Sequence, residues 1–514
     1  MRMMVKKRIM NTDIWAVVSV IVFSFVAHSF RYFNLMFSHD SLLVYQDEIK
    51  WKIGLGRFFQ PIYWLFRGEL CAPLLLGICS IVWLSLAVVL ILRLLDIKDR
   101  TPIVIVGGIL STCSTITYTN ATYIHETDTY MLALLFAVAS VYVWKKWNNG
   151  WLVGSVLIMI SLGLYQSHFQ SAVILALIVL VKMLLDEENF SKVFLEGIKA
   201  IMMLLIGGIL YYGLFKLTLT LTGVSANTGY NGISSVGNYD GSSLPLLIRN
   251  TYGYAIRQFV FPETYNRKGI VTLVNSLLAI LTVCGIIKIV RSKTLSKKSV
   301  ILLVFLLTIM PFGMNVVYFI SKGMEHSLMT FSFNFLYVFA VLIFGYCRNV
   351  FGDNKDNKKT KWSRYTEIAV VIGFFVLIWC NVVFSNQVYL KKGLQEQATL
   401  SIMTRVTERI EQTDGYVAGE TPVAIVGNLN NSILAQERTG FEGVTGVGLD
   451  GNYAVTYELT YKEYYEFILS EKINLVSEKE VSSYSAMTEV RDMPAFPSAG
   501  CCKYIGKTLV IKLS

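Results

Sequence analysis

The sequence is dominated by apolar runs that are long enough to cross a lipid bilayer. A transmembrane helix needs about 20 mainly apolar residues, and this chain repeats runs of roughly 17–25 such residues, separated by short polar segments. Of its 514 residues, 54% are hydrophobic and only 16% are charged, whereas about a quarter are charged in a typical soluble protein. The pattern predicts a polytopic α-helical membrane protein.

We predict eleven membrane spans. They lie approximately at 13–34, 72–95, 101–119, 128–144, 151–167, 169–185, 197–221, 269–290, 299–319, 327–347 and 366–386. The first span follows "MRMMVKKR" and has no cleavage site of small residues after it. We therefore interpret it as a retained span and not as a signal peptide.

The distribution of Lys and Arg predicts the orientation. They are concentrated in the short segments that face the cytoplasm if the N-terminus does, as in "KDNKKTKWSR". The positive-inside rule favours this arrangement. It also accounts for the net charge of +11, and the chain has no basic repeats typical of nucleic-acid binding. An odd number of spans places everything after residue 386 outside the cytoplasm.

The chain divides into two predicted domains. Residues 1–386 form a transmembrane domain with two long outer loops, 37–71 and 222–268, and each loop holds a segment that suits a helix lying along the interface. Residues 387–514 have the composition of a small α/β domain outside the cytoplasm, with strand-like "PVAIVG", "INLVS" and "TLVIKLS". The Gly-rich stretch 223–243 lacks the P-loop pattern.

Ionisable side chains gather on the predicted outer side. All five histidines lie there, together with carboxylates of four loops. These residues are His28, His39, His125, His168, His326, Asp40, Asp47, Glu48, Glu69, Glu126, Asp128, Glu263 and Glu325. Ionisable groups at span ends are costly to desolvate, so a cluster facing one compartment suggests a functional site. Each residue taken alone is equally consistent with a hydrated loop position.

Such a cluster suits the transfer of a sugar from a phosphate. A carboxylate can take the proton from a sugar hydroxyl, and a leaving phosphate needs cations to receive its charge. Arg57 is placed for the phosphate, perhaps with Lys52, Arg257 or Lys322, while aromatic and amide side chains would hold sugar rings. The substrate-binding candidates are His39, Trp51, Arg57, Gln60, His125, Glu126, Asp128, Tyr165, Gln166, His168, Arg257, Lys322 and His326. Arg57 is also consistent with binding of lipid headgroups, and Asp128 with a helix cap.

His125, Glu126 and Asp128 could instead bind a divalent metal ion. They are close in sequence, and carboxylates suit Mg²⁺ or Mn²⁺. One short stretch of ligands is weak evidence, and no Cys forms a CxxC pattern. We therefore predict no metal site and no cofactor.

Five motifs resemble the bacterial type II Gtr glucosyltransferases, which are named for phage-encoded conversion of O-antigen serotype. The motifs are "FSHD", "GLGRFFQPIY", "YTNATYIHETDTYMLAL", "SLGLYQSHFQSA" and the ending "RDMPAFPSAGCCKYIGKTLVIKLS". The last is similar to the family's closing Met-Pro-x-(Phe/Tyr)-Pro pattern. The sequence departs from the family at "KGMEHSLM", where Lys322 or His326 would replace a basic residue of the family.

The resemblance implies a GT-C type membrane glycosyltransferase of a bacterial plasma (inner) membrane. Its donor would be a polyprenyl-phosphate sugar, probably undecaprenyl-phosphate glucose, and its acceptor a surface polysaccharide or its lipid-linked precursor. An acidic residue of the first outer loop acts as base in many such enzymes, which implies Asp40, with Asp47 in reserve. Two other classes stay open: a transporter or flippase for lipid-linked sugars, and a non-catalytic component of polysaccharide assembly.

Overall fold

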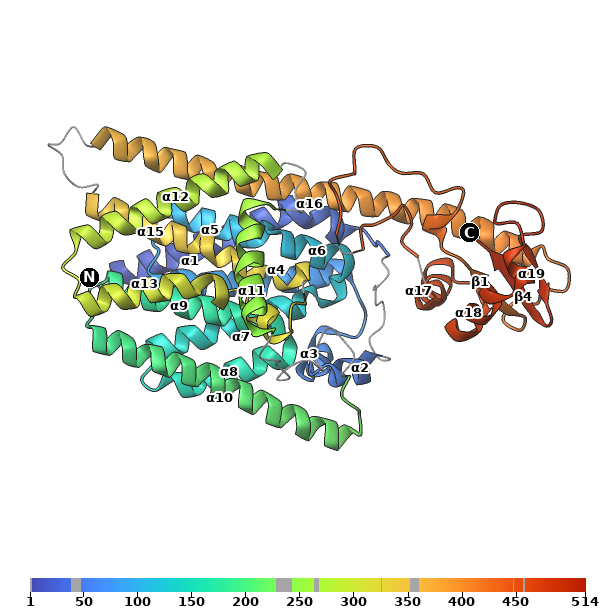
Figure 1. The fold of residues 1–514 in the computed structure, drawn as a ribbon, viewed down its shortest axis with the longest axis horizontal. Helices are drawn as coiled ribbons and strands as arrows, with labels where there is room; N and C mark the ends of the chain where they lie inside the picture. The colour runs from blue at the N-terminus through green and yellow to red at the C-terminus, as the bar shows by residue number, and fades with distance from the viewer. Residues whose placement is uncertain are drawn as a thin grey trace.

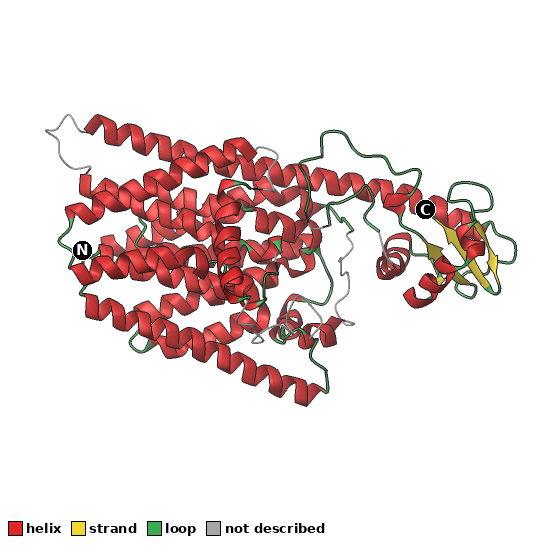
Figure 2. Cartoon of the chain, viewed as in Figure 1, coloured by secondary structure: helices red, strands yellow, loops and turns green. Residues whose placement is uncertain are grey.

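The computed structural model describes residues 2–37, 48–227, 243–262, 268–324, 326–351, 360–446, 448–455 and 458–514. Long helices lie side by side in a bundle, and one of them continues out of the bundle to a small sheet (Figure 1, Figure 2). The N-terminus lies at the end of the bundle far from that sheet (Figure 1).

The bundle helices coincide with the predicted spans. They are α1 (Arg2–Phe33), α4 (Pro73–Leu95), α5 (Arg100–Thr112), α6 (Ser114–Thr122), α7 (Thr127–Lys146), α8 (Gly150–Leu164), α9 (Phe169–Leu185), α10 (Phe190–Thr222), α12 (Lys268–Ser292), α13 (Lys297–Gly313), α15 (Phe335–Phe351) and α16 (Thr360–Glu411). Among the described residues, nine helical stretches are long and apolar enough to cross a membrane. The predicted spans 151–167 and 299–319 fall on the shorter helices α8 and α13. The chain is therefore a helical membrane protein.

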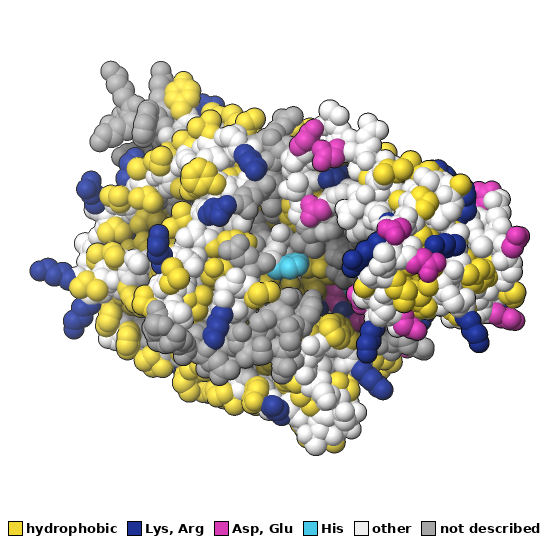
Figure 3. Space-filling view, turned by 45° about the vertical axis from the view of Figure 1, so that its right-hand side comes forward, with side chains coloured by type: hydrophobic (Ala, Val, Ile, Leu, Met, Phe, Trp, Pro, Cys, Tyr) yellow, Lys and Arg dark blue, Asp and Glu magenta, His cyan; other side chains and the backbone are white. Residues whose placement is uncertain are grey.

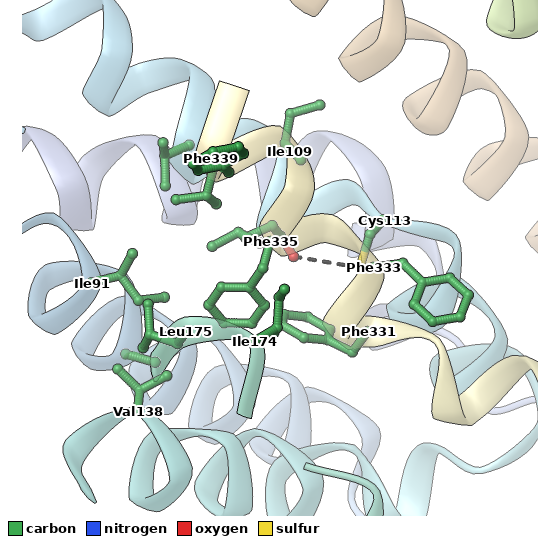
Figure 4. Close-up of a cluster of buried hydrophobic side chains, with 14 of the residues drawn as sticks. Ile91, Ile109, Cys113, Val138, Ile174, Leu175, Phe331, Phe333, Phe335 and Phe339 are labelled. Carbon is green, nitrogen blue, oxygen red and sulfur yellow. Dashed lines mark hydrogen bonds between the residues drawn. The ribbon is translucent and has the colours of Figure 1, made fainter. Parts of the chain in front are cut away.

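Close approach of helices and dense aromatic packing hold the bundle together. Gly207 of α10 lies so near α8 that an added Cβ would be 2.6 Å from Ile158, which is the role of small residues between membrane helices. In Figure 4, Phe331 and Phe335 point toward Ile174 and Leu175 of α9. All four of these side chains are fully or almost fully buried.

Short helices occupy the predicted outer side. They are α2 (Ile49–Gly54), α3 (Phe59–Arg67), η2 (Ile124–Glu126), η3 (Gln166–His168), α11 (Leu244–Val260), α14 (Val316–Ile320), η5 (Ser327–Met329) and η6 (Phe331–Asn334). The first interfacial segment forms two helices because the chain turns between them at Gly56, whose φ is +76°. Helix α11 packs on α12 and α13 and runs across the bundle axis (Figure 1).

The C-terminal part contains a four-stranded sheet of order β2-β1-β4-β3. Its strands are β1 (Pro422–Val426), β2 (Asn474–Leu475), β3 (Cys502–Ile505) and β4 (Thr508–Lys512). Strand β1 is parallel to β2 and β4, and β3 is antiparallel to β4. Three of the strands match the strand-like sequences; β3 was not predicted. Its helices are α17 (Glu458–Glu463), a π-helical segment (Tyr464–Leu469), α18 (Glu478–Ala486) and α19 (Thr488–Arg491).

Helix α16 joins the bundle to the sheet. It has 52 residues, which at 1.5 Å per residue makes it about 78 Å long, whereas the hydrocarbon core of a bilayer is about 30 Å thick. Its last turns place Ile402, Met403, Val406 and Ile410 in the core that covers the sheet. The predicted domain boundary at residue 387 falls inside this helix and stays a prediction. We call residues 387–514 the C-terminal domain.

In the view of Figure 3, Asp and Glu side chains lie in the half of the molecule that holds the C-terminal domain, whereas Lys and Arg side chains lie on both halves and hydrophobic side chains are spread over the bundle. At the end near the N-terminus, ion pairs join neighbouring helices. Arg93 bonds to Asp13 with Nε–Oδ1 3.0 Å, and Lys293 lies 3.3 Å from Glu187. Large hydrophobic side chains of α1, α4, α10 and α12 are exposed, as expected of helices that face lipid.

Candidate active site

The two candidate bases, Asp40 and Asp47, lie outside the described residues, as does His39. The structure therefore places neither carboxylate. It does describe the chain on both sides of them, up to Phe37 and from Glu48 onward.

Three side chains of the segment between α1 and α4 converge on Glu126. Lys52 of α2 forms an ion pair with Glu126 Oε1, and Arg57 Nη1 lies 3.7 Å from the same oxygen. Gln60 of α3 donates Nε2–H to Glu126 Oε2 at 2.7 Å and to the Leu164 carbonyl at 2.9 Å. We call Lys52, Arg57, Gln60 and Glu126 the Glu126 cluster.

Two cationic side chains of the Glu126 cluster, Lys52 and Arg57, contact the same carboxylate. Glu126 is 1% exposed and the Lys52 side chain 6%, whereas the Arg57 side chain is 13% exposed. Charges this far from water interact more strongly than exposed ones. Of the two cations, Arg57 is the more exposed.

Aromatic rings line Arg57. Its Cζ lies 5.2 Å from the centroid of Tyr165 and 5.9 Å from that of Tyr130, and the two tyrosine rings stack 3.7 Å apart. Contact of a guanidinium with aromatic rings restricts its orientation and stabilises its charge. The same rings are of the kind that hold sugars by stacking.

Asp128 belongs to a separate buried ion pair. Arg67 Nε lies 3.1 Å from Asp128 Oδ2, and Tyr63 donates its hydroxyl to that oxygen at 3.0 Å. Trp83 Nε1–H in turn donates to Tyr63 Oη at 3.0 Å. Burial, and then the charge of Asp128, raise the pKa of Tyr63 well above its ordinary value, so the phenol stays a donor. These contacts favour a role in holding α3 on α7 and α4; substrate contact by Asp128 stays a prediction.

Asp128→Asn is expected to lower the free energy of unfolding by about 3–5 kcal/mol, because it leaves the Arg67 guanidinium buried without its counter-charge. Thermal unfolding of the purified protein in detergent measures the effect. Asp414→Asn, at an exposed position, is the control for loss of one carboxylate. An unfolding midpoint for Asp128→Asn equal to that of the native protein would contradict the structural role.

His125, His168 and His326 each pack against aromatic rings, whereas His28 contacts Tyr389 and the Ser111 carbonyl away from the Glu126 cluster. The ring of Tyr123 lies between those of His125 and His326, at 6.1 and 6.2 Å. His168 is buried between Tyr165 and Phe331, with ring centroids 5.6 Å away in each case.

Gln166 donates to the Leu55 carbonyl at 2.8 Å and to Tyr211 Oη at 3.0 Å. It therefore fixes the turn that carries Arg57.

Three predicted residues lie at exposed positions outside the buried cluster. Trp51 is 43% exposed on α2, Arg257 is exposed on α11, and Lys322 is exposed in the loop after α14 with φ +55°. Sequence reasoning left Lys52 as a secondary candidate and missed Tyr130, Tyr63 and Arg67. Tyr130, Tyr63 and Arg67 lie within a few positions of residues that were selected, and this closeness in sequence could have identified them.

The described residues contain no group of three or more His, Cys, Asp or Glu side chains arranged to hold an ion. Glu126 and Asp128 are each occupied by cationic side chains instead.

The structure defines a polytopic membrane protein with a buried charged site formed by short helices and helix ends. A sequence model of the family described as "Glucosyl transferase GtrII" matches residues 30–344. This match covers more than half of the chain and includes the whole Glu126 cluster. The chain belongs to this family, and it is a membrane glycosyltransferase. No curated protein and no solved structure matched the chain.

Proposed function

We propose that this glucosyltransferase takes glucose from a polyprenyl-phosphate donor, undecaprenyl-phosphate glucose. It transfers the sugar to a surface polysaccharide such as O-antigen, or to its lipid-linked precursor, on the outer face of the bacterial inner membrane. The observation that supports this donor is the pair of cationic side chains in the Glu126 cluster, Lys52 and Arg57, of which Arg57 is the more exposed.

The proposed reaction is a single displacement. An acceptor hydroxyl oxygen attacks the anomeric carbon, the bond from that carbon to the phosphate oxygen breaks, and its electron pair leaves with the polyprenyl phosphate. Asp40 takes the hydroxyl proton, with Asp47 as the alternative base. Attack opposite to the leaving group inverts the anomeric configuration. Arg57 and Lys52 stabilise the charge that develops on the phosphate.

The proposed topology places the Glu126 cluster outside the cytoplasm. The basic "KDNKKTKWSR" segment and the helix-joining ion pairs near the N-terminus would then face the cytoplasm, in line with the positive-inside rule. The C-terminal domain would lie outside. The acceptor would therefore be met on the same side as the proposed base.

The test is transfer by the purified protein in lipid vesicles. We expect glucose to reach a glycan acceptor from polyprenyl-phosphate glucose, in the inverted configuration, and not from UDP-glucose. Anomeric configuration is read by NMR of the product. Transfer from UDP-glucose alone would contradict the proposed donor. Movement of the lipid-linked sugar across the bilayer without an acceptor, and without transfer, would favour a flippase.

A further inference from the structure

The C-terminal domain holds the start of the first outer loop. The ring of Phe37 is 1% exposed and lies in the hydrophobic core of this domain, together with Ile402, Val406 and Leu509. It meets Tyr464 edge-on, with ring centroids 5.2 Å apart. A residue that follows the first span by only a few positions is thus part of a core built by the last quarter of the chain.

Polar contacts fix the backbone at the same point. The amide of Phe37 donates to Glu396 Oε2 of α16 at 3.0 Å, and Tyr464 donates its hydroxyl to Glu396 Oε1 at 3.3 Å. One carboxylate therefore joins α16, the C-terminal domain and the chain that enters the loop.

Arg31 secures the same stretch from the side of the bundle. It is 1% exposed and donates Nη1–H to the Asn34 carbonyl at 2.9 Å and Nη2–H to the Met36 carbonyl at 3.1 Å. Its Nε–H donates to the Asn120 carbonyl at 2.8 Å. Residues 34–37 are consequently held both by the bundle and by the C-terminal domain.

We propose that Phe37, Glu396 and Tyr464 are positioning residues, through which the C-terminal domain fixes where the first outer loop begins. This inference rests on the proposed function, because the proposed base Asp40 follows Phe37 by three positions. The C-terminal domain then serves the chemical step and does more than stabilise the fold. We call the three side chains the Phe37 latch.

The latch is expected to affect kcat more than the donor KM. The Glu126 cluster is fixed by its own contacts with α3 and α8, so donor binding does not depend on Phe37. A misplaced base slows the chemical step instead, and a shift of about 1 Å can cost about 100-fold.

The experiment compares Phe37→Ala with Phe496→Ala in the full-length protein in vesicles. Phe496 lies in the same core and is 2% exposed, with its ring against Arg405. Both variants remove one buried ring and should lower the thermal midpoint similarly. We expect Phe37→Ala to lower kcat about 10- to 100-fold more than Phe496→Ala, with little change in the donor KM. Equal kcat values for the two variants would overturn the proposal.

A second pair decides the question if Phe37→Ala does not fold. Glu396→Ala removes the acceptor of the Phe37 amide, whereas the amide group of Glu396→Gln retains an acceptor for Phe37 N–H and a donor toward Tyr464 Oη. We expect Glu396→Ala to have a lower kcat than the native protein, and Glu396→Gln to have a kcat close to the native value. Native-like kcat in Glu396→Ala would overturn the proposal.

Hydrogen exchange separates a failed latch from a failed function. The peptide covering residues 34–37 should exchange faster in Glu396→Ala than in the native protein, with or without substrates. If the native protein transfers no glucose, the proposed function is wrong, and unchanged exchange would in addition overturn the latch.

Discussion

Asp40→Asn is expected to lower kcat for glucose transfer by about 10³-fold, which lies within the usual contribution of a general base. The amide has nearly the same size as the carboxylate but cannot accept the proton of the acceptor hydroxyl. The measurement is the initial rate of transfer in vesicles, with expression and thermal midpoint compared to the native protein. Because the change is isosteric, it should leave both of these controls unaltered.

Asp47→Asn is the matched comparison for Asp40→Asn. Both residues belong to the first outer loop, and both substitutions remove one carboxylate. We expect Asp47→Asn to retain most of its activity. The opposite pattern would move the base to Asp47, and full activity in both variants would show that neither residue is the base.

Arg57→Ala is expected to lower kcat/KM about 100-fold, because the leaving phosphate loses the accessible cation of the Glu126 cluster. Arg57→Lys should recover part of this loss, since it restores the charge but not the planar group that contacts Tyr165 and Tyr130. Initial rates at varied donor concentration give the values. Arg249→Ala, at an exposed position on α11, is the control and should have native kinetics.

Hydrophobic patterning was sufficient to place the membrane helices. Each predicted span falls mainly on helical residues, but 101–119, 299–319 and 327–347 are each divided between successive helices. The pair 151–167 and 169–185 corresponds to α8 and α9, with only Tyr165 and η3 between them. Runs of apolar residues are a local signal, so they can be read without knowing the contacts. The break at Gly56 was not predicted; its φ is +76°, and an added Cβ there would clash with Tyr211 of α10.

The residues that form the candidate site were easier to predict than the contacts between them. Arg57, Gln60, Glu126 and Tyr165 were all selected from the sequence, because polar and aromatic groups stand out at span ends. That Gln60 bonds to Glu126, 66 residues away, is a property of the folded bundle. For the same reason the pattern gave Asp128 and Glu126 similar roles, although the two carboxylates have different partners.

The C-terminal domain illustrates the limit of sequence reasoning most clearly. Its strands β1, β2 and β4 follow from runs of β-branched residues, but the short edge strand β3 carries the pattern "CKYI", which has no clear alternation. The residues next to Phe37 in the sequence favour a loop, yet its ring lies in the core of this domain. No local pattern connects residues separated by more than 350 positions, as Phe37 and Glu396 are.

The most direct test of the proposed donor site is inhibition by sugar-free lipids. Polyprenyl phosphate and the neutral polyprenol share the same tail and differ only in the phosphate. The account predicts that the phosphate inhibits transfer by the native protein about 100-fold more strongly, and that this preference largely disappears in Arg57→Ala. Equal inhibition of the native protein by both lipids, or an undiminished preference in Arg57→Ala, would contradict a phosphate site at the Glu126 cluster.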